Sequence, residues 1–130
     1  MLSERRCAAM IPASDIERAK KWYAETLGFK PHLEDLGGGI QYKAGDGTEF
    51  GLYASQYAGT NQATAMAFVA TDLTAEMKDL RDRGVKFEEY DIPGVKTVNG
   101  IVEFAPGERA AWFKDSEGNI IALFESARYS

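Results

Sequence analysis

The chain has 130 residues, of which 45% are hydrophobic and 27% charged, and its formal net charge is -5. These values fit one globular domain with a sizeable core and exclude a disordered chain. Basic residues are interspersed with acids, so no basic patch predicts binding to nucleic acid or to an anionic membrane. The single cysteine, Cys7, excludes an intrachain disulfide and favours a reducing compartment. Without a signal-peptide pattern or about 18 consecutive apolar residues, a cytoplasmic protein is expected.

The first half of the chain predicts a strand, a helix and three further strands. An apolar strand over residues 7–11 is expected to end at Pro12. Ser14 and Glu17 then have the spacing of a helix capping box, in which each side chain accepts a backbone proton from the other end of the box. Apolar residues recur at helical spacing until Gly28, which suits the left-handed position that closes a helix. Strands separated by glycine-containing turns are expected over residues 29–34, 40–43 and 49–53.

The same order of elements begins again after a linker. Residues 55–64 are rich in Ser, Gly, Thr, Asn and Gln and predict this linker. An apolar strand is expected over residues 65–70, and Thr71 is expected to cap a second helix. Further strands are expected over residues 87–90 and 101–104.

The spacing between equivalent residues supports an internal repeat. Asp72 follows Asp15 by 57 residues, and Gly118 follows Gly47 by 71 residues. The second copy therefore carries about fifteen extra residues, expected within residues 92–107. Two tandem copies predict a fold with two similar halves.

The closing segment, residues 111–125, predicts a strand, a tight turn and a second strand. Residues 115–119 are turn formers, and Gly118 supplies the positive φ that such a turn needs. This segment is similar to the closing hairpin of the vicinal oxygen chelate superfamily, Asp-Pro-Asp-Gly-x-x-x-Glu-Leu. That superfamily contains glyoxalases, bleomycin-resistance proteins and extradiol dioxygenases. Residues 11–29, from Ile-Pro-Ala-Ser-Asp to Leu-Gly-Phe, resemble its opening signature.

The resemblance implies an α+β fold in which two tandem βαβββ modules form an open barrel-like cup. In this fold the helices pack outside and the cavity suits a small ligand. A single domain is expected over residues 1–130. Module one would span about 5–54, the linker 55–64 and module two about 65–126.

In the superfamily, each module supplies metal ligands from inward positions on its first and fourth strands. By resemblance, the equivalent positions here are occupied by Ala8, Gly51, Ala65 and Ala122. None of these side chains has a donor atom, whereas zinc, nickel, iron and manganese sites need His, carboxylate or thiolate ligands. A metal-free member without a cofactor is therefore expected. A relocated metal site built from His32, Glu49 and Glu103 is the alternative.

Strand alternation selects the candidate binding residues, because every second side chain shares one sheet face. If Gly51 faces the cup, so do its in-phase neighbours. Either Trp112 or Phe113 faces the cup, and the same choice holds for Gln41 and Tyr42. The candidate ligand-binding residues are Gln41, Glu49, Tyr53, Glu103, Trp112 and Phe124. No catalytic residue is assigned.

Two functions fit this pattern. The favoured one is a metal-free protein that holds a small apolar or aromatic ligand, with the negative net charge favouring a cation. The alternative is a glyoxalase- or dioxygenase-like lyase or oxidoreductase. Such an enzyme would use Glu49 or Glu103 as a general base, or relocated metal ligands. The expected partners are a small molecule and, by resemblance, a second copy of the chain, but neither nucleic acid nor a membrane.

Overall fold

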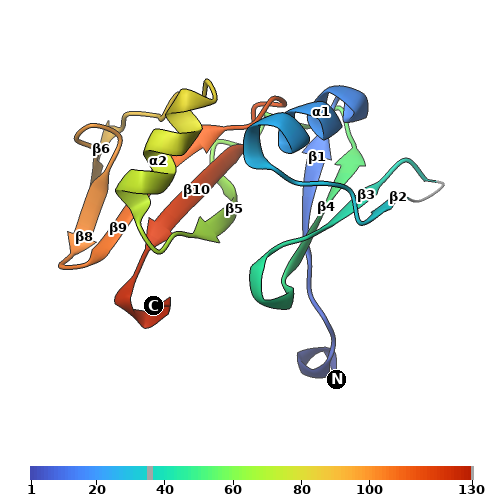
Figure 1. Ribbon diagram of the computed structural model, residues 1–130, viewed down its shortest axis with the longest axis horizontal. Helices are drawn as coiled ribbons and strands as arrows, with labels where there is room; N and C mark the ends of the chain where they lie inside the picture. The colour runs from blue at the N-terminus through green and yellow to red at the C-terminus, as the bar shows by residue number, and fades with distance from the viewer. Residues whose placement is uncertain (35–36, 130) are drawn as a thin grey trace.

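The computed structural model describes residues 1–34 and 37–129, which form two units side by side (Figure 1). The first unit is one helix on one sheet. Its elements are β1 (Ala9–Ala13), α1 (Ile16–Leu27), β2 (Leu33–Glu34), β3 (Ile40–Lys43) and β4 (Glu49–Ala54). Short 3-10 turns, η1 (Leu2–Glu4) and η2 (Gly45–Gly47), precede β1 and connect β3 to β4.

The second unit repeats this plan with an additional small hairpin. Its elements are β5 (Thr64–Val69), α2 (Leu73–Asp82), β6 (Asp91–Ile92), β7 (Val95–Lys96), β8 (Val102–Ala105), β9 (Glu108–Lys114), β10 (Ile120–Glu125) and the 3-10 turn η3 (Ala127–Tyr129). Apart from Asp91, the β6–β7 hairpin lies within residues 92–107, where the extra residues were expected. Neither α-helix of the described chain has the length and hydrophobicity needed to cross a bilayer.

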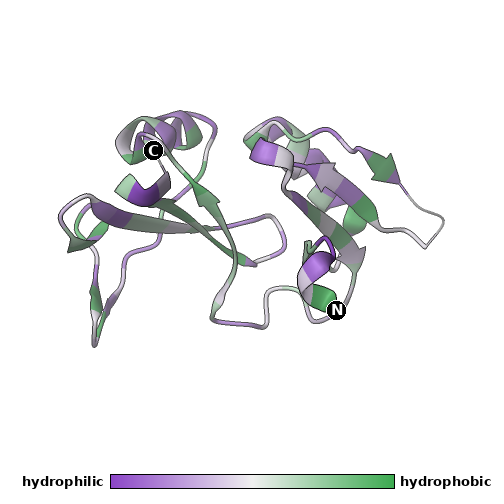
Figure 2. Ribbon diagram, turned by 90° about the horizontal axis from the view of Figure 1, so that it is seen from below, coloured by the Kyte–Doolittle hydropathy of each residue, from purple (hydrophilic) through white to green (hydrophobic). Residues whose placement is uncertain are grey.

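Equivalent strands occupy equivalent places in the two main sheets. Sheet A has the order β1-β4-β3-β2, and sheet B has the order β5-β10-β9-β8. In each sheet the first strand runs parallel to the last, and the other neighbours are antiparallel. Figure 2 shows the two units from below, still side by side. The predicted α+β fold with tandem βαβββ units is confirmed, as two open sheets and not a closed barrel.

Each helix covers one face of its own sheet and buries an apolar cluster there. The first cluster is centred on Tyr23, Tyr42 and Phe50. The second is centred on Met77 and Phe113. Partly buried side chains from α1 and β5 pack against both clusters, namely Trp22, Leu27, Met66 and Phe68. The two units are therefore joined by apolar contacts as well as by the linker.

Three predicted strand boundaries are wrong for identifiable reasons. Pro12 lies inside β1 because β1 is an edge strand, where a missing N–H can be accommodated. Phe29 does not start a strand. It follows the C-cap Gly28, and its N–H donates to the carbonyl of Tyr23 in the last turns of α1. Phe87 makes only one bridge, to Phe113, while β8 forms the named strand paired along β9.

The predicted helix caps are each displaced by one residue. Asp15 is the N-cap of α1 and accepts a hydrogen bond from the N–H of Arg18 at 3.0 Å. Asp72 caps α2 in the same way, accepting from Ala75 N–H at 3.1 Å. Ser14, the predicted cap, instead bonds to a distant carboxylate. Gly28 has φ 79° at the end of α1, as predicted.

Candidate functional site

The face of sheet A that points away from α1 carries three of the candidate residues. Phe50 and Leu52 are buried beneath α1, so the alternating residues of β4 lie on the opposite face. These are Glu49, Gly51 and Tyr53. Gln41 pairs with Gly51 across the β3–β4 ladder and therefore shares this face. We call the faces of the two sheets that point away from their helices the open faces.

Gly51 makes room for its neighbours on the open face. A Cβ added at this position would lie 2.9 Å from Nε2 of Gln41 and 3.0 Å from Cε of Met10. These two side chains therefore lie directly over the glycine. The Gln41 amide is held over the centre of the sheet, where it could hydrogen-bond to a ligand.

The open face of sheet B carries two more candidates. Phe113 and Leu123 are buried in the second cluster, so Trp112 and Phe124 point the other way. Trp112 pairs directly with Ala122, which has no functional group. The candidate on this strand pair is thus the tryptophan and not Phe113.

Aromatic side chains outside sheet B support this open face. The ring of Tyr90 meets Trp112 edge-on at 5.6 Å, and the ring of Tyr129 meets Phe124 at 5.5 Å. The indole N–H of Trp112 donates to Oγ1 of Thr64 at 3.2 Å. Tyr90 and Tyr129 lie outside the regular strands, and so no period-2 pattern could have selected them.

Glu103 does not join the other candidates. It pairs with Arg109 across the β8–β9 ladder, and Arg109 pairs with Glu125 on β10. Glu125 accepts a hydrogen bond from Leu73 N–H at the start of α2, which puts these side chains on the helix-covered face. The ladder irregularity between Glu103 and Ala105 could not be foreseen from strand alternation.

Among the residues that the structure describes, the open faces offer no suitable set of metal ligands. Gly51 and Ala122 lie on them without a donor atom, and the Glu49 carboxylate forms an ion pair with Arg6. No group of three or more His, Cys, Asp or Glu side chains is close enough to hold a metal ion within residues 1–34 and 37–129. The residues present therefore do not fit the ion that the superfamily resemblance implies.

A groove of about 610 Å³ runs along the seam between the two units. One wall is the turn between β3 and β4, and the other is β5 together with Thr71, just before α2. We call it the seam groove. It reaches the open faces at Glu49 and at Ala67 but does not include the other five candidates.

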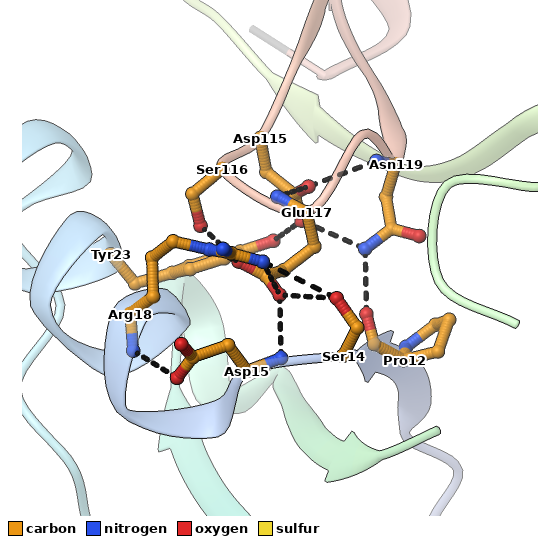
Figure 3. A network of polar contacts seen from close by, with 9 residues as sticks. All are labelled: Pro12, Ser14, Asp15, Arg18, Tyr23, Asp115, Ser116, Glu117 and Asn119. Atoms are coloured by element: carbon orange, nitrogen blue, oxygen red, sulfur yellow. Dashed lines mark hydrogen bonds and ion pairs between the residues drawn. The ribbon is translucent and has the colours of Figure 1, made fainter. Parts of the chain in front are cut away.

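A buried polar network joins the units at the opposite end of the seam (Figure 3). Glu117, in the β9–β10 turn, accepts from Nε of Arg18 at 2.8 Å, from the N–H of Asp15 at 2.9 Å and from Oγ of Ser14 at 3.2 Å. Ser116 also donates to it at 2.9 Å. We call these five residues the Glu117 junction. Three of the four partners of Glu117, namely Ser14, Asp15 and Arg18, lie 99 to 103 residues before it in the sequence, so no local motif signals the contact.

The charge of Glu117 is stabilised despite full burial of its side chain. Burial alone would raise its pKa, but hydrogen bonds from Arg18, the Asp15 N–H and Ser116 together outweigh burial and lower the pKa to about 2. The same contact raises the pKa of Arg18. Both groups therefore remain charged at neutral pH.

A second buried contact lies beside the junction. The hydroxyl of Tyr23 donates to Oδ2 of Asp115 at 2.7 Å, and Asn119 donates to the Pro12 carbonyl at 2.8 Å. Burial and then the Asp115 charge raise the pKa of Tyr23 far above its usual value. The turn of β9–β10 is thus bonded both to α1 and to β1.

The chain consists of two similar units, each with a helix packed on a four-stranded sheet. Aromatic and small residues lie on the open faces of the sheets. This arrangement defines a class of small proteins built around a cup. The model of the Glyoxalase/Bleomycin resistance protein/Dioxygenase superfamily matches residues 7–123, so the chain belongs to this superfamily. The resemblance seen in residues 11–29 and in the closing segment, residues 111–125, is confirmed.

Solved structures share this fold over nearly the whole chain. A glyoxalase family protein from Enterococcus faecalis is 20% identical with a TM-score of 0.72, covering 96% of this chain and 100% of its own. A superfamily member from Sphaerobacter thermophilus DSM 20745 is 25% identical with a TM-score of 0.69, at 95% and 98% coverage. TnmS3, an antibiotic binding protein from Streptomyces sp. CB03234, is 26% identical with a TM-score of 0.63, at 92% and 95% coverage. Comparison with curated proteins found no match.

Proposed function

We propose that this chain is a metal-free binding protein for a small apolar or aromatic molecule, held on the open faces of the two sheets. The observation that carries this proposal is Trp112 beside the donor-free Ala122, facing away from the core. An aromatic wall next to a small residue leaves a flat surface on which a planar ring can stack. The described function of TnmS3, antibiotic binding, supports the same use of the fold.

A second copy of the chain is part of this proposal. Apolar side chains on sheet A stay exposed in a single chain, among them Leu33 at 59%, Met10 at 49% and Tyr53 at 40%. Covering them would enclose a ligand and remove apolar surface from water. We also propose a single domain with modules at about 5–54 and 65–126, and a cytoplasmic location consistent with the unpaired Cys7.

A metal-independent enzyme has weaker support. Glu49 lies on the open face, but its carboxylate is already engaged in an ion pair with Arg6. Glu103 lies on the helix-covered face, away from Trp112 and Tyr53. Neither acid therefore has the buried, isolated setting that raises the basicity of a catalytic carboxylate.

Metal content tests the metal-free part of the proposal. We expect protein purified without chelator to contain far less than one equivalent of zinc, nickel, iron or manganese by plasma mass spectrometry. One equivalent of any of these metals, retained after dialysis, would overturn the proposal that the protein is metal-free.

Binding of planar aromatic compounds tests the site itself. In a thermal-shift screen, we expect compounds that raise the melting temperature of the natural chain to lose at least half of that shift with Tyr53→Ala. Tyr57→Ala is the matched control, because Tyr57 lies in the linker with 69% of its surface exposed. If the Tyr53 and Tyr57 variants respond alike to every compound, the open face of sheet A is not the binding surface.

A further inference from the structure

The two ends of the seam between the units are equivalent in the repeat but differ in structure. The β9–β10 turn corresponds to the β3–β4 turn, which places Asp46 at the position of Glu117. The starts of the helices also correspond, so Thr71 matches Ser14 and Ala75 matches Arg18. The Glu117 junction closes one end of the seam. Asp46 and Thr71, at the other end, line the seam groove.

At the open end Arg6 pairs with Glu49, and among the described residues no cation pairs with the turn acid Asp46. In the Glu117 junction, Arg18 neutralises the carboxylate through two nitrogen atoms at 2.8 and 3.0 Å. In the repeat, the α2 residue that corresponds to Arg18 is Ala75, whose methyl group cannot pair with an anion. The Asp46 carboxylate is exposed to solvent, and within the described chain it takes part in no ion pair or hydrogen bond. The groove thus presents an unpaired negative charge where its counterpart holds a guanidinium.

The remainder of the groove suits an apolar body. Met66, Phe68 and Val69 of β5 line the wall opposite the β3–β4 turn. Val69 is 46% exposed, although it belongs to a strand next to the core. A volume of about 610 Å³ lies within the range of roughly 300–1,000 Å³ that small-molecule sites occupy.

We propose that the seam groove is a binding site for a small organic cation, an amine, amidine or guanidine attached to an apolar or aromatic group. The cationic group pairs with Asp46, where Arg18 pairs with Glu117 in the other half. The apolar group rests on Phe68 and Val69. This site borders the open faces at Glu49, Ala67 and Tyr129 but includes neither Trp112 nor Tyr53, so it does not depend on the proposed function.

A matched pair of probes isolates the role of charge. Benzamidine carries an amidinium, whereas benzamide has nearly the same shape and no charge. In titrations followed by amide NMR signals, we expect benzamidine to shift residues 46 and 69–71 and to bind about fivefold more tightly than benzamide, the size expected for an exposed ion pair. Asp46→Asn should abolish this difference, and Glu25→Gln, on the exposed face of α1, should leave it unchanged. Equal binding of the two probes to the natural chain would overturn the proposal.

A second variant tests the comparison between the two ends of the seam. Ala75→Arg would supply the missing guanidinium, so we expect benzamidine binding to fall about fivefold or more while the melting temperature is kept. Thr74→Arg adds the same charge at the adjacent exposed position and should reduce binding less. Tyr53→Ala should leave benzamidine binding unchanged, which separates this site from the open face. If Tyr53→Ala weakens benzamidine as strongly as Asp46→Asn, the seam groove is not the site.

Discussion

Two buried tyrosine hydroxyls in the first cluster differ in hydrogen bonding. The hydroxyl of Tyr23 donates to Asp115, whereas that of Tyr42 is buried without a hydrogen-bond partner in the described chain. Burial, followed by the charge of Glu34, raises the pKa of Tyr42 to about 12. The two ring centroids lie 6.1 Å apart with the rings stacked, and both side chains belong to the same apolar cluster.

This pair gives a prediction at the scale of one atom. Tyr42→Phe removes an unsatisfied hydroxyl and is expected to leave the free energy of unfolding unchanged or to raise it by up to about 1 kcal/mol. Tyr23→Phe removes one of the donors to the buried Asp115 carboxylate, which keeps those of Asn119 and the Glu117 N–H, and is expected to lower it by about 1–3 kcal/mol. Urea unfolding at pH 7 measures both. A larger loss for the Tyr42 variant would mean that its hydroxyl has a partner in solution.

At the scale of elements, both helices begin with two carboxylates at their positive ends. Asp72 caps α2 from within the chain, and Glu125 of β10 accepts the Leu73 N–H at 2.9 Å. At α1, Asp15 is the equivalent cap, and Glu117 accepts from the N–H of Asp15 itself. The closing hairpin therefore supplies one acid to each helix start, where negative charge is stabilising.

Substitutions at the start of α2 distinguish the cap expected from the sequence, Thr71, from the cap seen in the structure, Asp72. Asp72→Ala is expected to lower the free energy of unfolding by about 1 kcal/mol, because it removes the acceptor for Ala75 N–H. Thr71→Ala, at the residue that the sequence favoured as cap, is expected to change it by less than about 0.5 kcal/mol. Both values come from urea unfolding. Equal losses for the two variants would restore Thr71 as a cap.

The sequence predicted elements well where one local rule was sufficient. Residues 40–43 form β3 as predicted, because a period-2 apolar pattern and flanking glycines leave little choice. Alternation also put Glu49 and Tyr53 on one face. It could not decide between Trp112 and Phe113, since that choice depends on which face α2 covers. Long-range partners such as Glu117 and Arg18 leave no local signal at all.

For the whole molecule, the Glu117 junction makes the attachment of the two units dependent on pH. The folded pKa of Glu117 is lowered from 4.5 to about 2. A lowered carboxylate pKa contributes stability that is fully present above pH 4.5 and is lost as the pH falls towards 2. The bonds to Arg109 and Leu73 N–H lower the pKa of Glu125 in the same direction.

Replacing this carboxylate tests its role. Glu117→Gln is expected to lower the free energy of unfolding by about 2 kcal/mol at pH 7, with a much smaller loss near pH 2. The natural chain and the variant should therefore converge as the solution is acidified. Glu25→Gln, on the exposed face of α1, serves as the control and should follow the natural chain at every pH. A constant difference between the Glu117 variant and the natural chain from pH 7 to 2 would show that shape, and not charge, matters here.

The unequal ends of the seam also bear on how such a repeated chain can diversify. When a gene segment is duplicated, both copies at first contain the same residues and make the same structural contacts. Here the bonds that unite the halves are concentrated at the β9–β10 turn, while the corresponding residues 44–48 make no such contact with α2. The β3–β4 loop can therefore accumulate substitutions and acquire new chemistry, because the β9–β10 turn supplies the hydrogen bonds that hold the two units together.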